Sequence, residues 1–170
     1  SSLLIEQSAE DLRRMFDVNV VGTALGIKQA FRAMRPGGAA GRGGAIVNIA
    51  SVAATIAFPG IAGYSASKSA VDRLTRIAAA EAGKLGYGVR VNCVCPGLVP
   101  TAMGMKLAVD CAAMGLFPSP DEAVAGVVQL TPSGRLGAVA DIADAILFLC
   151  GDGARFVNGT SLSVDGGMGS

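Results

Sequence analysis

Histidine is absent from this 170-residue sequence, and its four cysteines contain no CxxC pair. Without histidine, neither a Ser-His-Asp triad nor a Cys-His pair can be assembled from this chain. A zinc site is not expected because histidine and the usual cysteine spacing are both missing, and a disulfide framework is not expected in a chain of this length. We therefore predict buried, reduced thiols at Cys93, Cys95, Cys111 and Cys150.

Tryptophan is also absent, and only 5% of the residues are aromatic and 16% charged, with a formal net charge of +1. Such a chain lacks the basic and base-stacking surfaces of nucleic-acid-binding proteins. It has no run of about 18 apolar residues that could span a membrane, and the Ser1–Glu6 segment lacks the basic start of a signal peptide. We expect a cytoplasmic protein that binds neither nucleic acid nor membrane.

The pattern that is present alternates between helix and strand. Apolar residues at steps of three and four follow Ser8, a predicted N-cap, and continue to Pro36, which predicts one long amphipathic helix. The further predicted elements are a strand at 45–50, a helix at 62–85, a strand at 89–95, a helix at 138–150 and, at 159–167, a final strand with its exit turn. This order predicts a single α/β domain over residues 1–170, with a parallel sheet and helices on both faces.

Three features interrupt this regular pattern. The Gly37–Gly44 segment is rich in glycine, but it follows a helix and lacks a GxGxxG motif, so we interpret it as a connection and not as a phosphate loop. Residues 98–133 contain several methionines and prolines, a composition typical of either an adaptable substrate lid or a packed satellite of the domain. Asn19, a poor helix former within the first helix, needs a hydrogen-bond partner of its own.

Tyr64 and Lys68 stand four residues apart at the start of the second predicted helix. This spacing places them on one face, so the Lys68 ammonium is expected to favour the phenolate and to lower the pKa of Tyr64 from about 10. Ser51, directly after a predicted strand, could hold a substrate oxygen beside the phenol. A tyrosine and a lysine at this spacing also occur as an ordinary solvated pair, so this pattern alone does not establish a site.

Five features, in this order, resemble the short-chain dehydrogenase/reductase family across nearly the whole chain. They are the Asn19–Gly22 segment, Ser51, Tyr64 with Lys68, Pro96-Gly97 followed by Thr101, and the closing Val164–Gly167 segment. The resemblance implies a Rossmann-like, doubly wound parallel sheet. The family's glycine-rich cofactor loop and its Asn-Ala-Gly strand end are not in this sequence, so we expect a sheet that is incomplete in its amino-terminal half. Its first strand should then leave an apolar edge unpaired.

The resemblance also implies roles for individual residues. Tyr64 would be the general acid/base, and Lys68 would lower its pKa and hold the nicotinamide ribose. Ser51 would orient the substrate oxygen, and Asn19 would hold a water linked to Lys68. The implied cofactor contacts are Tyr64, Lys68, Pro96, Gly97, Val99 and Thr101.

By the same resemblance, the expected function is an NAD(P)-dependent oxidoreductase that interconverts a secondary alcohol and a ketone. The scarcity of charge in the methionine-rich segment favours an apolar or cyclic substrate. NAD is preferred over NADP, and a homodimer or homotetramer is the expected assembly.

Two other interpretations remain open. The chain could be a non-catalytic fragment or interaction module, with its two long helices as an association surface. A Ser-Lys hydrolase is suggested by Ser65 and Lys68 in an SxxK arrangement, but the Ser-Asp-Asn and Lys-Thr-Gly elements that accompany it are absent.

Overall fold

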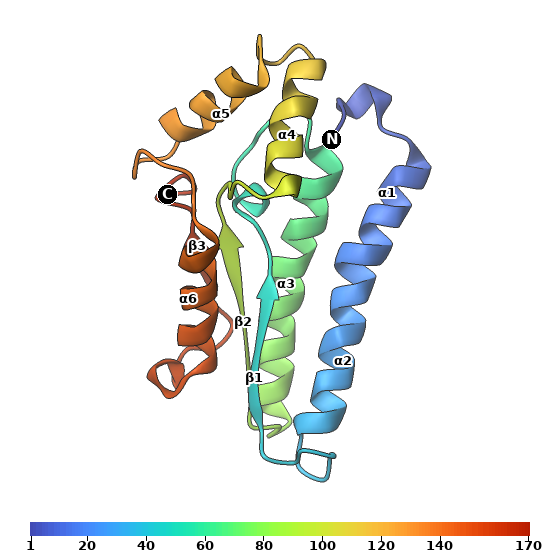
Figure 1. Ribbon diagram of the computed structural model, residues 1–170. Helices are drawn as coiled ribbons and strands as arrows, with labels where there is room; N and C mark the ends of the chain where they lie inside the picture. The colour runs from blue at the N-terminus through green and yellow to red at the C-terminus, as the bar shows by residue number, and fades with distance from the viewer.

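The computed structural model describes all 170 residues and shows a three-stranded parallel sheet with helices on both faces (Figure 1). The strands are β1 (Gly44–Ile49), β2 (Val89–Pro96) and β3 (Ser161–Val164), in the order β1-β2-β3. Both neighbouring pairs are parallel. The predicted α/β class is therefore confirmed.

The first long helix forms as predicted, except for one wide turn in its middle. It consists of α1 (Ala9–Phe16), a π-helical turn η2 (Asp17–Val21) and α2 (Gly22–Met34), without a break between them. Ser8 caps its start, because Ser8 Oγ accepts a hydrogen bond of 3.0 Å from the backbone N–H of Asp11. The helix ends just before Pro36, which cannot continue it.

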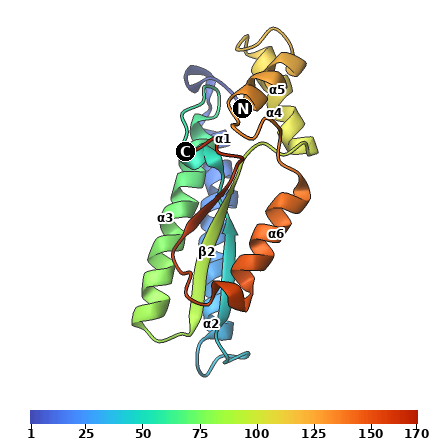
Figure 2. The same ribbon diagram turned by 90° about the vertical axis from the view of Figure 1, so that its left-hand side faces the viewer.

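The sheet separates two layers of the core. Helix α3 (Ala62–Lys84) lies beside α2 on one face, and α6 (Val139–Cys150) covers the other face (Figure 2). Val91 of β2 packs in the layer under α2 and α3, whereas Val94 packs with Leu149 of α6. β2 is thus buried on both sides, which accounts for its apolar residues at 89, 91 and 93–95, between which Arg90 and Asn92 stand.

Helices α4 (Ala102–Ala113) and α5 (Pro120–Gln129) lie beyond the carboxyl ends of the strands, at the top of Figure 1. They share a small apolar cluster of their own. Its buried members are Ala108, Cys111 and Ala123, and Phe58, Leu107, Met114, Leu116, Phe117 and Val124 pack against them. The methionine-rich segment is therefore an ordered helical pair packed on the domain.

One sequence prediction needs correction. The thiols of Cys93, Cys95 and Cys111 are buried, but Cys150, the last residue of α6, is exposed. The final strand and its turn lie within 159–167, as predicted. β3 is confined between Gly159 and Gly166, whose φ angles of 72° and 64° turn the chain away from an extended course.

β1 is an edge strand, as the resemblance implied. It pairs with β2 on one side only, and Ile49 at its carboxyl end is 45% exposed. An unpaired strand edge with apolar side chains promotes association with another chain. None of the helices is long and apolar enough to cross a bilayer.

Candidate active site

The carboxyl ends of β1 and β2 meet the first turns of α3 at one edge of the sheet, the upper edge in Figure 1. Ser51 follows the end of β1 by two residues. Tyr64 lies in the first turn of α3, and Lys68 lies one turn further on. Because open parallel sheets bind ligands at this edge, the three residues stand where the fold class places a site.

Ser51 begins the loop that follows β1. Its Oγ accepts a hydrogen bond of 3.1 Å from the N–H of Ala53 and starts the 3-10 turn η3 (Val52–Ala54). The residue is buried. Since Oγ is an acceptor toward the backbone, its own proton remains available to a group in the site.

Tyr64 is half-buried, and its ionisation differs from the sequence prediction. Burial raises the pKa of Tyr64 above its ordinary value of 10.0, and a hydrogen bond with the Ser51 side chain, the smaller effect, lowers it. The Lys68 ammonium lies over the Tyr64 ring, with Nζ 5.7 Å from the ring centroid. The predicted lowering of the Tyr64 pKa by Lys68 is therefore wrong for this structure, because removal of the phenol from water outweighs the effects that favour phenolate.

Lys68 is held at the carboxyl end of β1. Its Nζ donates a hydrogen bond of 2.8 Å to the backbone carbonyl of Ile49. Burial lowers the pKa of Lys68. An ammonium has three N–H donors, so two remain for a ligand after this contact.

Two further serines tie α3 to the loop that carries Ser51. Ser65 Oγ donates a hydrogen bond of 2.5 Å to the carbonyl of Ala53, and Ser69 Oγ donates one of 3.2 Å to the carbonyl of Ala54. This role of the two serines was not predicted from the sequence. The available signal was the four-residue spacing of the two serines, which places them on one face of α3 beside the Tyr64 turn.

Asn19 reaches the site from the π-helical turn η2. Its Nδ2 donates a hydrogen bond of 3.0 Å to Ser67 Oγ, and Ser67 Oγ donates one of 2.7 Å to the carbonyl of Tyr64. The backbone carbonyl of Asn19 accepts a hydrogen bond of 2.7 Å from Thr23 Oγ1. π-helical turns are rare and occur frequently at functional sites. The structure thus links Asn19 to the turn of α3 that carries Tyr64.

Gly97, just beyond β2, packs against the closing segment of the chain. A Cβ at Gly97 would lie 3.0 Å from the Cα of Asp165, so a larger residue would displace one of the two backbones. The buried Asp165 carboxylate accepts hydrogen bonds of 3.0 Å and 3.1 Å from the N–H groups of Gly167 and Gly169. The Pro96-Gly97 motif and the closing Val164–Gly167 segment are therefore packed against each other.

The segment from Pro96 to Thr101 connects β2 to α4. Thr101 Oγ1 accepts a hydrogen bond of 3.2 Å from the N–H of Gly104 and so caps α4. The Thr101 N–H donates to the carbonyl of Val99 at 2.7 Å. These bonds fix the backbone of the segment at the same edge of the sheet as Ser51.

The side chains present fit the nicotinamide end of a dinucleotide. Lys68 has two free N–H donors for ribose hydroxyls, and Thr101 keeps its hydroxyl proton for a carboxamide, since its Oγ1 accepts from the backbone. These 170 residues contain no GxGxxG loop between a strand and a helix, so they do not account for pyrophosphate contacts. At no point do three or more His, Cys, Asp or Glu side chains gather as for a metal ion.

The chain is similar in sequence and in structure to several known proteins. A family model described as Enoyl-(Acyl carrier protein) reductase matches residues 1–169. The chain is 44% identical over 156 residues to 2-(S)-hydroxypropyl-CoM dehydrogenase 3 of Xanthobacter autotrophicus. It has the same identity over the same length to a protein of that organism named inactive 2-(S)-hydroxypropyl-CoM dehydrogenase 2. A solved structure, NAD+-bound xylitol dehydrogenase, superposes with a TM-score of 0.89 at 29% identity.

The matches cover this chain more fully than they cover its relatives. The two Xanthobacter matches take in 91% of this chain but 56% and 62% of those proteins. The xylitol dehydrogenase match takes in 98% of this chain and 63% of that one. The chain thus spans about three fifths of the length of these relatives, and the match of the family model to residues 1–169 shows that it belongs to the short-chain dehydrogenase/reductase family.

Proposed function

We propose that this protein is an NAD(P)-dependent oxidoreductase that interconverts a secondary alcohol and a ketone. The observation that carries the proposal is the joint placement of Ser51, Tyr64 and Lys68 at the ligand-binding edge of the sheet. Its similarity to proteins named hydroxypropyl-CoM dehydrogenase and xylitol dehydrogenase supports the same reaction class.

Tyr64 acts as the general acid/base in this proposal. Because burial raises the pKa of Tyr64, the phenol is protonated at neutral pH and is able to give its proton to a carbonyl oxygen. Ser51 Oγ, fixed by the N–H of Ala53, donates its proton to the same substrate oxygen and orients it. In the opposite direction Tyr64 must lose its proton, and the ammonium of Lys68 over the ring favours that ionised form.

A nicotinamide cofactor, when bound, supplies or accepts the hydride. In this chain, Lys68 and Tyr64 would hold the nicotinamide ribose, and Thr101 would hold the carboxamide, beside the backbone of Pro96, Gly97 and Val99. Likeness to the solved structure of NAD+-bound xylitol dehydrogenase supports NAD as the preferred cofactor.

The 98–133 segment is the proposed substrate lid, and an apolar or cyclic substrate suits its composition. Met103 and Met105 of α4 are exposed within two turns of Thr101. Phe58 and Phe117 stack with their ring centroids 6.5 Å apart and pack against the apolar cluster of α4 and α5. Flexible methionine side chains can adapt to apolar ligands of varied shape.

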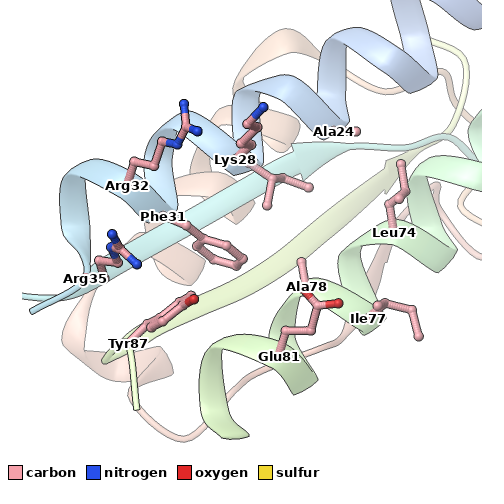
Figure 3. Close-up of a pocket in the computed structure, with 11 residues that line it drawn as sticks. Ala24, Lys28, Phe31, Arg32, Arg35, Leu74, Ile77, Ala78, Glu81 and Tyr87 are labelled. Carbon is pink, nitrogen blue, oxygen red and sulfur yellow. The ribbon is translucent and has the colours of Figure 1, made fainter. Parts of the chain in front are cut away.

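A homodimer formed through α2 and α3 is the proposed assembly. A groove of about 520 Å³ runs between the two helices, with Phe31, Ile77 and Tyr87 among its apolar lining residues (Figure 3). Arg32 on α2 and Glu81 on α3 line it as well, and neither forms an ion pair within the chain. A two-fold axis between two copies would place Arg32 of one copy near Glu81 of the other.

A second candidate function is association without catalysis. The unpaired edge of β1 favours it, as does 44% identity to a relative named inactive. Titration of NADH and NADPH into the 170-residue chain, followed by nicotinamide fluorescence, discriminates between the two candidates. Saturable binding supports the oxidoreductase, whereas absence of binding to the chain supports the association module.

Substitution of the tyrosine tests the chemistry itself. We expect Tyr64→Phe to lower kcat by about 10²-fold to 10⁴-fold, the usual contribution of a general acid/base, while the Kd for NADH changes less than about twofold. Tyr87→Phe is the matched control, since Tyr87 is the only other tyrosine and packs against Phe31 with ring centroids 5.4 Å apart. Turnover of Tyr64→Phe at the rate of Tyr87→Phe would refute the assignment.

A further inference from the structure

Ser67 carries two hydrogen bonds with a single hydroxyl group. The side chain is fully buried, at 0% exposure, between the Tyr64 turn of α3 and the turn η2. Its proton is committed to the carbonyl of Tyr64, 2.7 Å away. A hydroxyl has one proton, so toward Asn19 the Ser67 Oγ can only accept.

This restriction decides which end of the Asn19 carboxamide faces α3. An acceptor at Ser67 requires a donor opposite it, so the NH₂ group must face Ser67, in agreement with the 3.0 Å contact of Nδ2. The carboxamide Oδ1 is then turned away from Ser67. The second anchor is the Asn19 carbonyl, which Thr23 Oγ1 holds at 2.7 Å.

We propose that Ser67 is a positioning residue of the active site, which acts by fixing the orientation of the Asn19 carboxamide against the helical turn that carries Tyr64 and Lys68. The proposal rests on the proposed oxidoreductase function. Without the Ser67 acceptor, the carboxamide is free to rotate by 180° or to leave α3. A donor would then stand where the Oδ1 acceptor of Asn19 now lies, and proton movement to and from Tyr64 would be altered.

The same helix contains a structural twin of this arrangement. Thr75 is also 0% exposed, donates a hydrogen bond of 2.9 Å to the carbonyl of Val71 and accepts one of 2.9 Å from Asn48 Nδ2. Thr75 lies eight residues after Ser67, about 12 Å further along α3. The two sites therefore share burial and hydrogen bonding and differ in their distance from Tyr64.

This twin supplies the matched control. Ser67→Ala removes a buried hydroxyl, and Thr75→Val replaces one with a methyl group; each leaves one asparagine NH₂ without its acceptor. We expect both to lower the urea midpoint of unfolding by a similar amount. Only Ser67→Ala should lower kcat, by tenfold or more with KM changed less than twofold, and displace the pH profile of kcat. Ser67→Thr retains the hydroxyl and should restore kcat to within about threefold of the unsubstituted protein.

Two further measurements separate positioning from simple loss of stability. If Ser67 acts through Asn19, adding Asn19→Ala to Ser67→Ala should cause less than twofold further loss of kcat. Exchange of the Asn19 side-chain NH₂ protons, followed by NMR, should accelerate in Ser67→Ala and not in Thr75→Val.

Two results would contradict the positioning role of Ser67. An unchanged kcat and pH profile in Ser67→Ala, with the same loss of stability as Thr75→Val, would overturn the proposal and make Ser67 purely structural. The proposal would also be overturned if Asn19→Ala and Ser67→Ala lowered kcat independently, so that the fold-loss of the double variant was the product of the two single losses. Failure of the underlying function has a different signature, because Tyr64→Phe would then keep its turnover.

Discussion

Asn92 controls how β3 is held beside the site. Its side chain is fully buried in β2, at 0% exposure. Nδ2 donates a hydrogen bond of 3.0 Å to the carbonyl of Val157, and Oδ1 accepts one of 3.0 Å from the N–H of Thr160. These bonds anchor the loop that leads into β3, and β3 in turn delivers Asp165 to its position against Gly97.

We expect Asn92→Ala to lower the free energy of unfolding by about 3 kcal/mol. The truncation leaves the N–H of Thr160 unpaired, which costs about 2 kcal/mol. It also removes the shorter of two hydrogen bonds to the carbonyl of Val157, which keeps a contact of 3.4 Å from Arg90 Nη1, and this costs about 1 kcal/mol. Asn158→Ala is the matched control. Asn158 is exposed and accepts one bond of 2.8 Å, from the N–H of the buried Val91, so its truncation affects a single backbone group and we expect a smaller loss of about 1–2 kcal/mol.

Asn92→Asp separates hydrogen bonding from packing. The aspartate keeps the shape and the acceptor for Thr160, but it loses the donor to Val157 and buries a charge. Burial raises the pKa of such a carboxyl above its unfolded value, so the folded state binds the proton more tightly than the unfolded state. The Asn92→Asp variant should therefore lose most stability, relative to the unsubstituted protein, at neutral pH. The loss should shrink as the pH falls, because the protonated carboxyl can donate to the carbonyl of Val157 again.

Urea unfolding followed by circular dichroism measures these differences, since the chain has no tryptophan to report by fluorescence. Equal slopes of free energy against urea would show that the variants unfold from the same compact state. A loss below about 1 kcal/mol for Asn92→Ala, or equal losses for Asn92→Ala and Asn158→Ala, would refute the reasoning.

Two further outcomes follow from the structure. Burial, the largest effect on Asp72, raises its pKa, but hydrogen bonds from Ser161 and Arg76 and nearby positive charge lower the pKa overall. Asp72 therefore stabilises the fold above its unfolded pKa of about 3.9, and Asp72→Asn should cost more stability at pH 7 than at pH 3 in urea titrations; a larger cost at pH 3 would contradict this. The unpaired edge of β1 should make the chain associate, so sedimentation should detect species larger than 16.9 kDa, with fewer in Ile49→Lys; a stable monomer would contradict the prediction.

The secondary structure was predictable because its signals are local. The cap at Ser8 and the stop at Pro36 bound the first helix in both the sequence and the structure. The runs at 45–50 and 89–95 predicted strands, and β1 and β2 form there. Each of these features depends on residues within a few positions of one another, which is the range over which helix caps and strand patterns act.

The wide turn at Asn19 was only partly predictable. The sequence showed that a polar side chain in an apolar helix needs a partner, but the partner, Ser67, lies 48 residues away. Its position depends on how α3 packs beside η2. The serines at positions 65 and 69 were missed for the same reason, because their acceptors belong to a different segment of the chain.

Sequence alone determined which groups could meet: the spacing of Tyr64 and Lys68 on one helical face, and the place of Ser51 after a strand, are consequences of helix and strand periodicity. Tertiary structure decided what those groups do to one another. The pKa of Tyr64 is raised and not lowered, because its exposure to water is set by segments that are distant in the chain. Local periodicity determines on which face of a helix or strand a side chain lies. Its burial and its hydrogen-bond partners are determined only when the whole chain has packed.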